Sequence, residues 1–262
     1  SSDLGKEKRT AIFPKLIFTL KKGLNFAPTD PNYDIKQLAL ECSTKRMYPD
    51  LLMYDKIVEL TGRFKTPMGC RSFLQCWQDE NGVTVNSGRM NLGVVSVNLP
   101  RISLFAKGDM ALFWEIFDEK MALCHEALSY RIERTKEAVP ENAPLLYMYG
   151  AFGKRLKATD KVDEVFKNGR ATISLGYVGL YETCLTFFGA NWEKNPEAHE
   201  FAEDIVKKMN EYCQQWEAES GYHYSLYSTP AESLTDTFCH LDKQKFGDVP
   251  DITDKEYYTN SF

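Results

Sequence analysis

The 262-residue sequence has little that would suit a metal site, a disulfide framework or a membrane span. Its seven cysteines are widely spaced and form no CxxC pair, so it has neither a zinc knuckle nor a thioredoxin-type motif. No apolar run reaches the roughly 18 residues that a membrane helix needs, and the opening SSDLGKEKRTAIFPK has no signal-peptide core. We therefore expect a cytoplasmic protein with free thiols and no membrane partner.

Positive charge is in slight deficit: the sequence has 32 Lys and Arg against 37 Asp and Glu. The formal net charge is -5, whereas a protein that binds phosphate backbones needs a basic face, so we expect no nucleic-acid partner. A GxGxxG dinucleotide fingerprint is absent. With 43% hydrophobic and 26% charged residues, the composition is that of an ordinary globular protein, and the length is ample for a sizeable core.

Apolar patterning predicts alternating strands and helices. We expect strands at 13–20, 83–85, 91–100, 144–150, 171–176 and 222–228. We expect helices at 30–50, 108–138, 160–167, 177–188, 196–219 and 230–242. Asp30 is the expected cap of the first helix, and Pro49 its end. The alternation favours βα units in an open sheet or barrel. Because no linker-like segment divides the chain, we expect one domain over 1–262.

Cys70 stands out in the segment FKTPMGCRSFLQCW, residues 64–77. Pro67 and Gly69 predict a tight loop that displays the thiol. One interpretation is a buried turn cysteine; the other is a reactive sulfur at a loop tip. Ionic thiol chemistry needs a nearby base or cation, and no histidine lies close in sequence. Radical chemistry needs only a sulfur close to a C–H bond.

The block YSTPAES, residues 227–233, leaves two interpretations open. Thr229, Pro230 and Glu232 match a capping box, in which Glu232 is mainly a helix cap. A helix N-terminus also presents free N–H groups to phosphate, so the same residues could meet a substrate. For Arg170, we favour a surface charge over a phosphate contact.

Six blocks resemble one family: KRMYPDLL, TPMGCRSFL, GRMNLGVVSVNLPRI, NGRATISLGYVGLYET, SLYSTPAESL and YYTNSF. Together, in this order and across nearly all of the chain, they resemble the class III (anaerobic, glycyl-radical) ribonucleoside-triphosphate reductase large subunit. The resemblance implies a partial ten-stranded α/β barrel with a cysteine-bearing finger loop. It also implies that 1–262 is an incomplete catalytic barrel segment from the central-to-late part of the barrel.

The resemblance also implies roles for individual residues. Cys70 matches the thiyl-radical residue that abstracts the ribose 3′ hydrogen, and Asn91 matches an asparagine suited to hold a ribose hydroxyl or formate. The implied reaction reduces ribonucleoside triphosphates to deoxyribonucleotides, with formate as reductant. Further residues are implied to contact substrate: Met68, Ser72, Tyr227, Ser228, Thr229 and Glu232.

The same resemblance implies partners and cofactors. We expect no cofactor in this chain. The full-length protein is expected to carry a glycyl radical, installed by an S-adenosylmethionine iron–sulfur activase, and a zinc site; the sequence has neither an Arg-Val-Cys-Gly-Tyr-like motif nor the zinc cysteines. Expected partners are ribonucleoside triphosphates, formate, nucleotide effectors, the radical-SAM activating enzyme and a second copy in a homodimer.

Two alternatives stay open at this point. One is another glycyl-radical enzyme of the formate-lyase or dehydratase type. The other is a non-catalytic α/β binding module in which Cys70 is structural. As a fragment, the chain is expected to be inactive alone, to bind nucleotides weakly, and to self-associate or expose a large apolar groove where the missing half of the barrel belongs.

Overall fold

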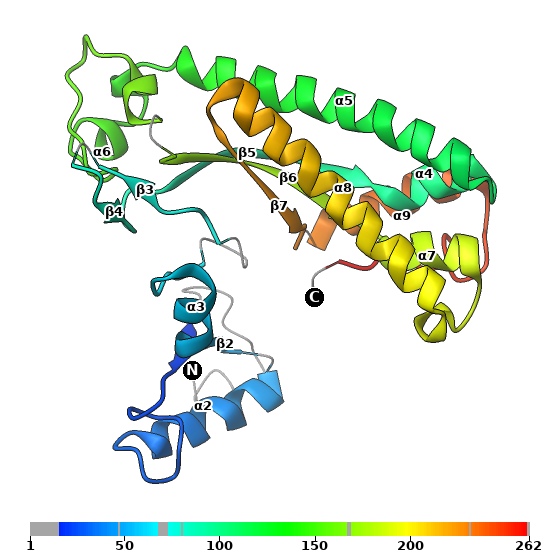
Figure 1. The fold of residues 1–262 in the computed structure, drawn as a ribbon, viewed down its shortest axis with the longest axis horizontal. Helices are drawn as coiled ribbons and strands as arrows, with labels where there is room; N and C mark the ends of the chain where they lie inside the picture. The colour runs from blue at the N-terminus through cyan, green and yellow to red at the C-terminus, as the bar shows by residue number, and fades with distance from the viewer. Residues whose placement is uncertain are drawn as a thin grey trace. The chain divides into compact units, whose positions relative to one another are not determined.

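The computed structural model of the chain describes residues 16–46, 48–67, 73–79, 81–166, 169–230 and 232–260 (Figure 1). Met68, Cys70 and Ser72 lie outside these residues. The chain divides into two compact units, residues 1–66 and 67–262. No linker-like segment marks this boundary, and the expectation that 1–262 acts as one catalytic segment stays a prediction.

The smaller unit contains a two-stranded parallel sheet. Strand β1 (Ile17–Leu20) pairs with β2 (Asp50–Met53), and helix α2 (Tyr33–Arg46) lies between them in sequence. Helix α3 (Tyr54–Thr61) follows β2 directly and ends at Gly62, whose φ of 73° is a left-handed conformation that favours glycine.

Two expectations for this unit need correction. Asp30 does not cap α2: its carboxylate accepts the backbone N–H groups of Phe26 and Ala27, both at 2.8 Å, and so closes the preceding turn. The sequence analysis also missed β2 and α3. The four-residue strand is too short to give a pattern, and it takes its form from pairing with β1.

The larger unit is built on a three-stranded parallel sheet. Strands β5 (Met90–Asn98), β6 (Ala171–Val178) and β7 (His223–Ser228) lie in the order β5-β6-β7, as predicted for buried parallel strands. A short antiparallel hairpin, β3 (Trp77–Gln78) and β4 (Thr84–Val85), precedes β5 in the chain. Among the described strands, β5 and β7 each pair on one side only.

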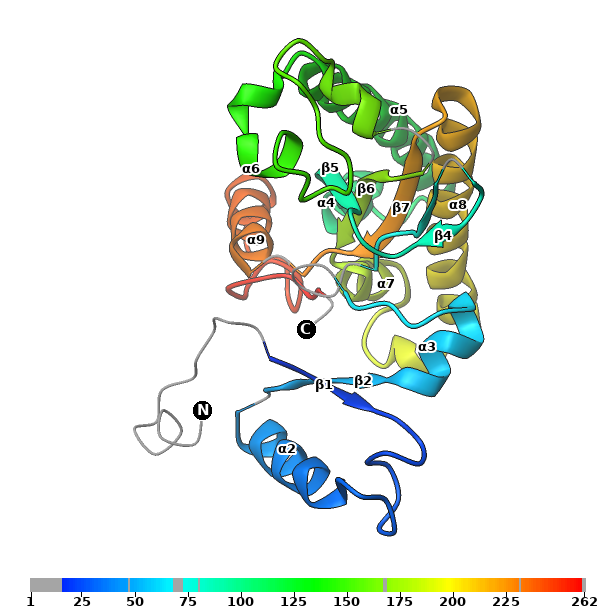
Figure 2. The same ribbon diagram turned by 90° about the vertical axis from the view of Figure 1, so that its left-hand side faces the viewer.

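Two long helices cover one face of this sheet. Helices α5 (Met110–Lys136) and α8 (Pro196–Ser220) lie along the strands in Figures 1 and 2. Asp109 caps α5 by accepting the backbone N–H groups of residues 111 and 112. The buried side chains of α5 recur at helical spacing: Phe113, Phe117, Met121, Cys124, Leu128 and Ile132. None of the described helices is both long and apolar enough to cross a membrane.

Each strand leads to a helix at its carboxyl end. Helix α4 (Leu99–Ala106) follows β5, α7 (Leu180–Phe188) follows β6, and α9 (Glu232–Phe246) follows β7. The sheet and these connections form βα units, as the alternation of patterns predicted. Parallel strands place their carboxyl ends at one edge, so these three helix starts gather at that edge.

Some of the connecting segments differ from the prediction. Residues 144–150 do not form a strand: Pro144 begins a short helix, α6 (Pro144–Tyr147), a position where its fixed φ is favourable. The helix expected at 160–167 is a single 3-10 turn, η2 (Val162–Val165). Two further 3-10 turns are η1 (Pro140–Asn142) and η3 (Trp192–Lys194).

The core under α5 generates a first prediction. Phe117→Ala should lower the free energy of unfolding by about 3–5 kcal/mol, because it leaves a cavity in a packed interior; Phe117 is 0% exposed. Tyr130→Ala on the same helix is the control, since Tyr130 is 65% exposed. Urea denaturation followed by tryptophan fluorescence measures both. Equal midpoints for the two variants would contradict the assignment of α5 to the core.

Candidate functional site on the hydroxyl face of the sheet

The face of the sheet opposite α5 and α8 carries hydroxyl groups. On β6, Ile173 and Leu175 point into the hydrophobic core, so Thr172, Ser174 and Gly176 alternate onto the other face. Both Thr172 and Ser174 are 0% exposed. The central strand is therefore buried on both faces, apolar on one and hydroxyl-bearing on the other.

Asn91 lies on this face, hydrogen-bonded to its neighbours. Its Nδ2 donates to Ser174 Oγ at 2.8 Å, and its Oδ1 accepts the backbone N–H of Gly93 at 2.9 Å. Ser174 Oγ lies 2.8 Å from Ser225 Oγ on β7. One polar chain thus runs across all three strands, from Asn91 through Ser174 to Ser225.

Gly93 forms the backbone irregularity that positions the Asn91 side chain. The register of β5 against β6 shifts between Asn91 and Val94, and Gly93 has a φ of 147°. A Cβ at this position would lie 3.0 Å from Arg131 Nη1 on α5. The bulge brings the Gly93 N–H back toward Asn91, which fixes the side-chain amide.

A second pair of hydroxyls meets above Gly176. Ser96 Oγ and Thr229 Oγ1 lie 2.8 Å apart, and a Cβ on Gly176 would lie 2.1 Å from Thr229 Oγ1. The backbone N–H of Thr229 donates to the Tyr177 carbonyl at 2.9 Å. Only glycine at 176 permits this close approach. The pair joins β5 to the segment after β7.

The structure places some of the expected site residues together. Tyr227 and Ser228 end β7, and Tyr227 pairs with Gly176 in the register. Thr229 is 4% exposed, and its hydroxyl contact is with Ser96. Glu232 is the first residue of α9, and its role as cap or substrate contact stays a prediction.

Sequence reasoning missed the partners of Asn91. Ser174 and Ser225 both lie in strands where hydroxyl and apolar residues alternate, ATISLGYV and HYSLYS, and this alternation was the available signal. Thr172 shares the face, and its Oγ1 has no hydrogen-bond partner in the described part of the chain. The register of β5, β6 and β7 decides which hydroxyl groups come within hydrogen-bond distance of one another.

Arg170 is not a surface charge, and that interpretation was wrong. It is 7% exposed, its guanidinium lies 3.6 Å from the centroid of the Trp77 ring, and it donates to the Phe152 carbonyl at 2.7 Å. Burial lowers the pKa of the guanidinium from its usual value. Arg170 therefore ties the β3–β4 hairpin to the start of β6.

Two buried carboxylates organise the carboxyl edge of the sheet. Asp242 of α9 accepts from Asn98 Nδ2 at 2.8 Å and from Tyr258 Oη at 2.9 Å, and it pairs with Arg101. Burial and the Asp242 charge raise the pKa of Tyr258. Glu182 accepts the Thr259 backbone N–H at 2.9 Å. These bonds hold α9 and the last described residues against the strand ends.

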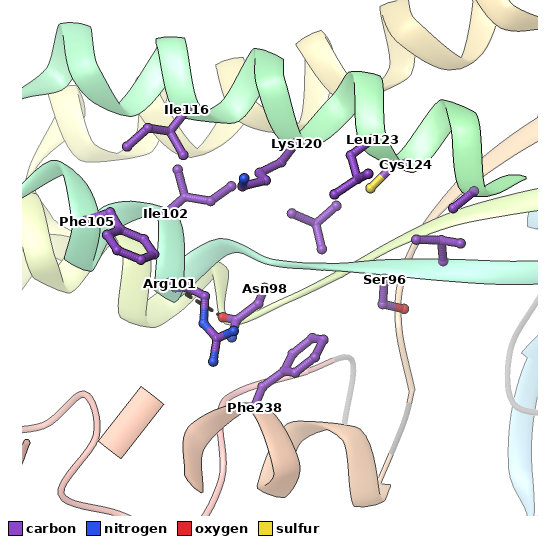
Figure 3. A pocket seen from close by; sticks show the side chains of 13 residues that line it. Ser96, Asn98, Arg101, Ile102, Phe105, Ile116, Lys120, Leu123, Cys124 and Phe238 are labelled. Carbon is purple, nitrogen blue, oxygen red and sulfur yellow. Dashed lines mark hydrogen bonds between the residues drawn. The ribbon is translucent and has the colours of Figure 1, made fainter. Parts of the chain in front are cut away.

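A mostly apolar pocket follows the outer edge of β5. Its volume is about 360 Å³, and Figure 3 shows Leu123 and Cys124 of α5 on one side and Phe238 of α9 on the other. Arg101 and Lys120 are its charged residues. Nothing identifies this pocket with the large apolar groove expected at the missing half of the barrel, so that groove and the self-association of the chain stay predictions.

The described cysteines are free, and most are buried. Desolvation raises the pKa of Cys124 to about 11 and those of Cys184 and Cys213 to about 12. These thiols stay protonated at neutral pH. Cys124 and Cys213 belong to the buried core cluster under α5 and α8. Among the described residues, no group of three or more His, Cys, Asp or Glu side chains could hold a metal ion.

The hydroxyl face suits some reactions and not others. The Asn91, Ser174 and Ser225 side chains donate and accept hydrogen bonds but do not take up protons near neutral pH. Such a face can hold a hydroxyl or a carboxylate. It supplies no general base of its own, so it fits a reaction in which the chemistry begins at another group.

Comparison with known proteins gives a consistent result. A family model described as "Anaerobic ribonucleoside-triphosphate reductase" matches residues 1–262. The anaerobic ribonucleoside-triphosphate reductase of Escherichia coli (strain K12) is 56% identical over 260 residues, which are 99% of this chain. The chain spans only 36% of the length of that relative.

Solved structures show a similar fold. The anaerobic ribonucleotide reductase from Thermotoga maritima with citrate in the active site has a TM-score of 0.64 and 20% identity over 98% of this chain and 42% of its own. The same enzyme in complex with dATP and CTP has a TM-score of 0.58 and 20% identity, over 94% of this chain and 37% of its own. The mixed α/β fold with parallel strands is consistent with the partial α/β barrel that the sequence resemblance implied.

The close approach at Gly176 predicts a steric effect. Gly176→Ala should lower the free energy of unfolding by about 1–3 kcal/mol, because the new methyl group displaces Thr229 and Ser96. Ser96→Ala, which removes one hydroxyl and adds no atom, should cost only about 1 kcal/mol. Urea midpoints rank the two variants. A Gly176→Ala protein as stable as the parent would show that the strands separate freely here.

The raised thiol pKa values predict selective alkylation. At pH 8, about one Cys124 thiol in a thousand is ionised when its pKa is about 11, so native iodoacetamide labelling should bypass Cys124, Cys184 and Cys213. Half-buried Cys42 should label. Mass spectrometry identifies the sites, and labelling in urea is the positive control. Native labelling of Cys213 as fast as Cys42 would contradict the burial.

Proposed function

Because the chain belongs to the anaerobic ribonucleoside-triphosphate reductase family, we propose that the whole protein reduces ribonucleoside triphosphates to 2′-deoxyribonucleoside triphosphates. The observation that supports this most strongly is the family match over all of residues 1–262, which includes the Cys70 segment and the Asn91 strand. A related glycyl-radical lyase or dehydratase and a non-catalytic binding module have no comparable observation in their favour.

In this proposal, Cys70 carries the radical step. A glycyl radical elsewhere in the whole protein would take the hydrogen atom of the Cys70 thiol, which would leave a thiyl at Cys70. The Cys70 sulfur takes the ribose 3′ hydrogen, and the 2′ hydroxyl takes a proton and leaves as water. Formate gives two electrons and becomes carbon dioxide. Cys70 then returns a hydrogen to C3′. The balance is one ribonucleotide and one formic acid giving one deoxyribonucleotide, water and carbon dioxide.

Asn91 and the strand ends hold the reactants. Asn91 lies on the hydroxyl face of β5, where its amide orients formate or a ribose hydroxyl without taking a proton. Met68 and Ser72, which flank Cys70 in the sequence, are proposed to contact the substrate beside the Cys70 sulfur. The nucleotide binds where β7 ends and α9 begins, because a helix N-terminus favours phosphate. The residues proposed to contact it there are Tyr227, Ser228, Thr229 and Glu232.

Other components belong to the rest of the protein. We assign the radical glycine and the zinc site to segments outside this chain, since its sequence has neither motif. An S-adenosylmethionine iron–sulfur activase installs the radical, and the protein works as a cytoplasmic homodimer. Nucleotide effectors are proposed because the Thermotoga maritima relative was solved in complex with dATP and CTP.

An anaerobic assay tests the proposed function. The complete protein, activated and supplied with CTP and formate, should form dCTP at a rate that falls to background when formate is left out. Formation of dCTP that depends on thioredoxin or dithiothreitol and ignores formate would refute the formate assignment. No dCTP under any of these conditions would refute the reductase assignment.

The thiyl role predicts a separation of two signals. In the complete protein, Cys70→Ser should reduce dCTP formation to background, because a serine O–H bond is too strong to give up its hydrogen to the glycyl radical. The glycyl radical signal in electron paramagnetic resonance should remain. Cys42→Ser, in helix α2, is the control and should keep full turnover. Turnover by the Cys70→Ser protein would exclude a thiyl at this position.

A further inference from the structure

We propose that Ser174 and Ser225 are positioning residues that lock the Asn91 carboxamide so that its N–H group meets a carboxylate oxygen of formate. The proposal rests on the proposed function, since it concerns how the same site holds its reductant. It adds two residues on strands β6 and β7 and a direction of hydrogen bonding. Both follow from the contacts of the amide.

A backbone group shows which atom of the amide accepts and which donates. The N–H of Gly93 can only donate, and it meets Asn91 at 2.9 Å, so the atom that it meets is the acceptor Oδ1. The other amide atom, which lies 2.8 Å from Ser174 Oγ, is then the donor Nδ2. Rotating the amide by half a turn would place two N–H groups against each other.

The direction of the hydroxyl chain follows from this. Ser174 Oγ accepts from Asn91, so its own hydrogen is free to donate to Ser225 Oγ at 2.8 Å. Ser174 is 0% exposed, and these two are the partners that its side chain has in the described residues. Each bond polarises the next, so the bond from Asn91 to Ser174 is stronger within this chain than it would be alone, and it holds the amide in place.

The Asn91 amide therefore offers a fixed donor. One Nδ2 hydrogen bonds to Ser174, and the second has no partner among the residues that the structure describes. A carboxylate accepts hydrogen bonds and donates none, so it matches this hydrogen. A ribose hydroxyl oxygen could also accept it. Loss of the donor distinguishes the two acceptors: it would raise the KM for formate if formate is bound there, and the KM for CTP if the ribose hydroxyl is.

The test measures formate and nucleotide separately in the complete enzyme. Ser174→Ala should raise the KM for formate about tenfold, the equivalent of one lost hydrogen bond, and leave the KM for CTP within about twofold. Ser225→Ala should raise the KM for formate about threefold, because Ser225 acts on the amide through one further hydrogen bond. The double variant should match Ser174→Ala alone, since both serines act through one amide.

Two variants serve as controls. Ser103→Ala removes a serine hydroxyl that is also 0% exposed, bonded to the Pro100 carbonyl at 2.9 Å on α4; both KM values should stay within about twofold of the parent. Ser225→Thr keeps the hydroxyl and should restore the parental KM for formate.

The outcomes are distinct. A raised KM for CTP with an unchanged KM for formate would overturn the assignment to formate and give the donor to the ribose. Unchanged KM values for both formate and CTP would overturn the positioning role. The proposed function would still hold in that case, because turnover with formate would stay at the parental rate. A crystal structure provides a readout that needs no turnover: in Ser174→Ala the Asn91 side chain keeps only its Gly93 bond and should occupy more than one rotamer, whereas in Ser103→Ala it should keep the single parental rotamer. A single parental rotamer in Ser174→Ala would also overturn the proposal.

Discussion

Strand β6 is buried on both faces, and the rest of the larger unit is arranged around that constraint. Ile173 and Leu175 lie in the core beneath α5 and α8. On the opposite face of the strand, Ser174 is also 0% exposed. A buried hydroxyl is costly unless it is hydrogen-bonded, and polar groups on both neighbouring strands bond to Ser174, whereas Thr172 Oγ1 has no partner in the described residues. The groups that bond to Ser174 are those of Asn91 and Ser225.

The same constraint explains the two glycines that the face requires. Gly176 leaves room for Ser96 and Thr229 to meet above the strand, and Gly93 turns the backbone so that its N–H reaches Asn91. The result is a face that fixes the direction of its hydrogen bonds without any charged group in the network. Such a face suits radical chemistry that begins at a sulfur, because the protein has only to hold the reactants in place.

The parts of the fold that follow from local pattern could be predicted from the sequence. Helices α5 and α8 lie within two residues of their expected ends, because each repeats buried side chains at helical spacing. The segment 144–150 was mistaken for a strand because a short apolar run is compatible with a strand or a helix. Pro144 favours the helix, since it occupies the first helical position. Arg170 was wrongly predicted to be a surface charge, because nothing near it in the sequence indicates that its guanidinium packs on Trp77.

The candidate site divides in the same way. Asn91 was predicted from its motif, but Ser174 and Ser225 were not, since their partnership depends on the register of three strands far apart in the chain. The alternation of hydroxyl and apolar residues was visible, and the identity of the partners was not. The roles of Cys70, Met68 and Ser72 depend on residues outside the described part of the structure, so they stay predictions.

The central claim is that reductant and ribose bind on the hydroxyl face beside Asn91. The most direct measurement is a crystal structure of the complete protein with CTP and formate bound. The account predicts a formate oxygen within hydrogen-bond distance of Asn91 Nδ2, the ribose between Asn91 and Cys70, and the Ser174 bond kept. A nucleotide bound elsewhere, with only solvent against the Asn91 amide, would contradict it.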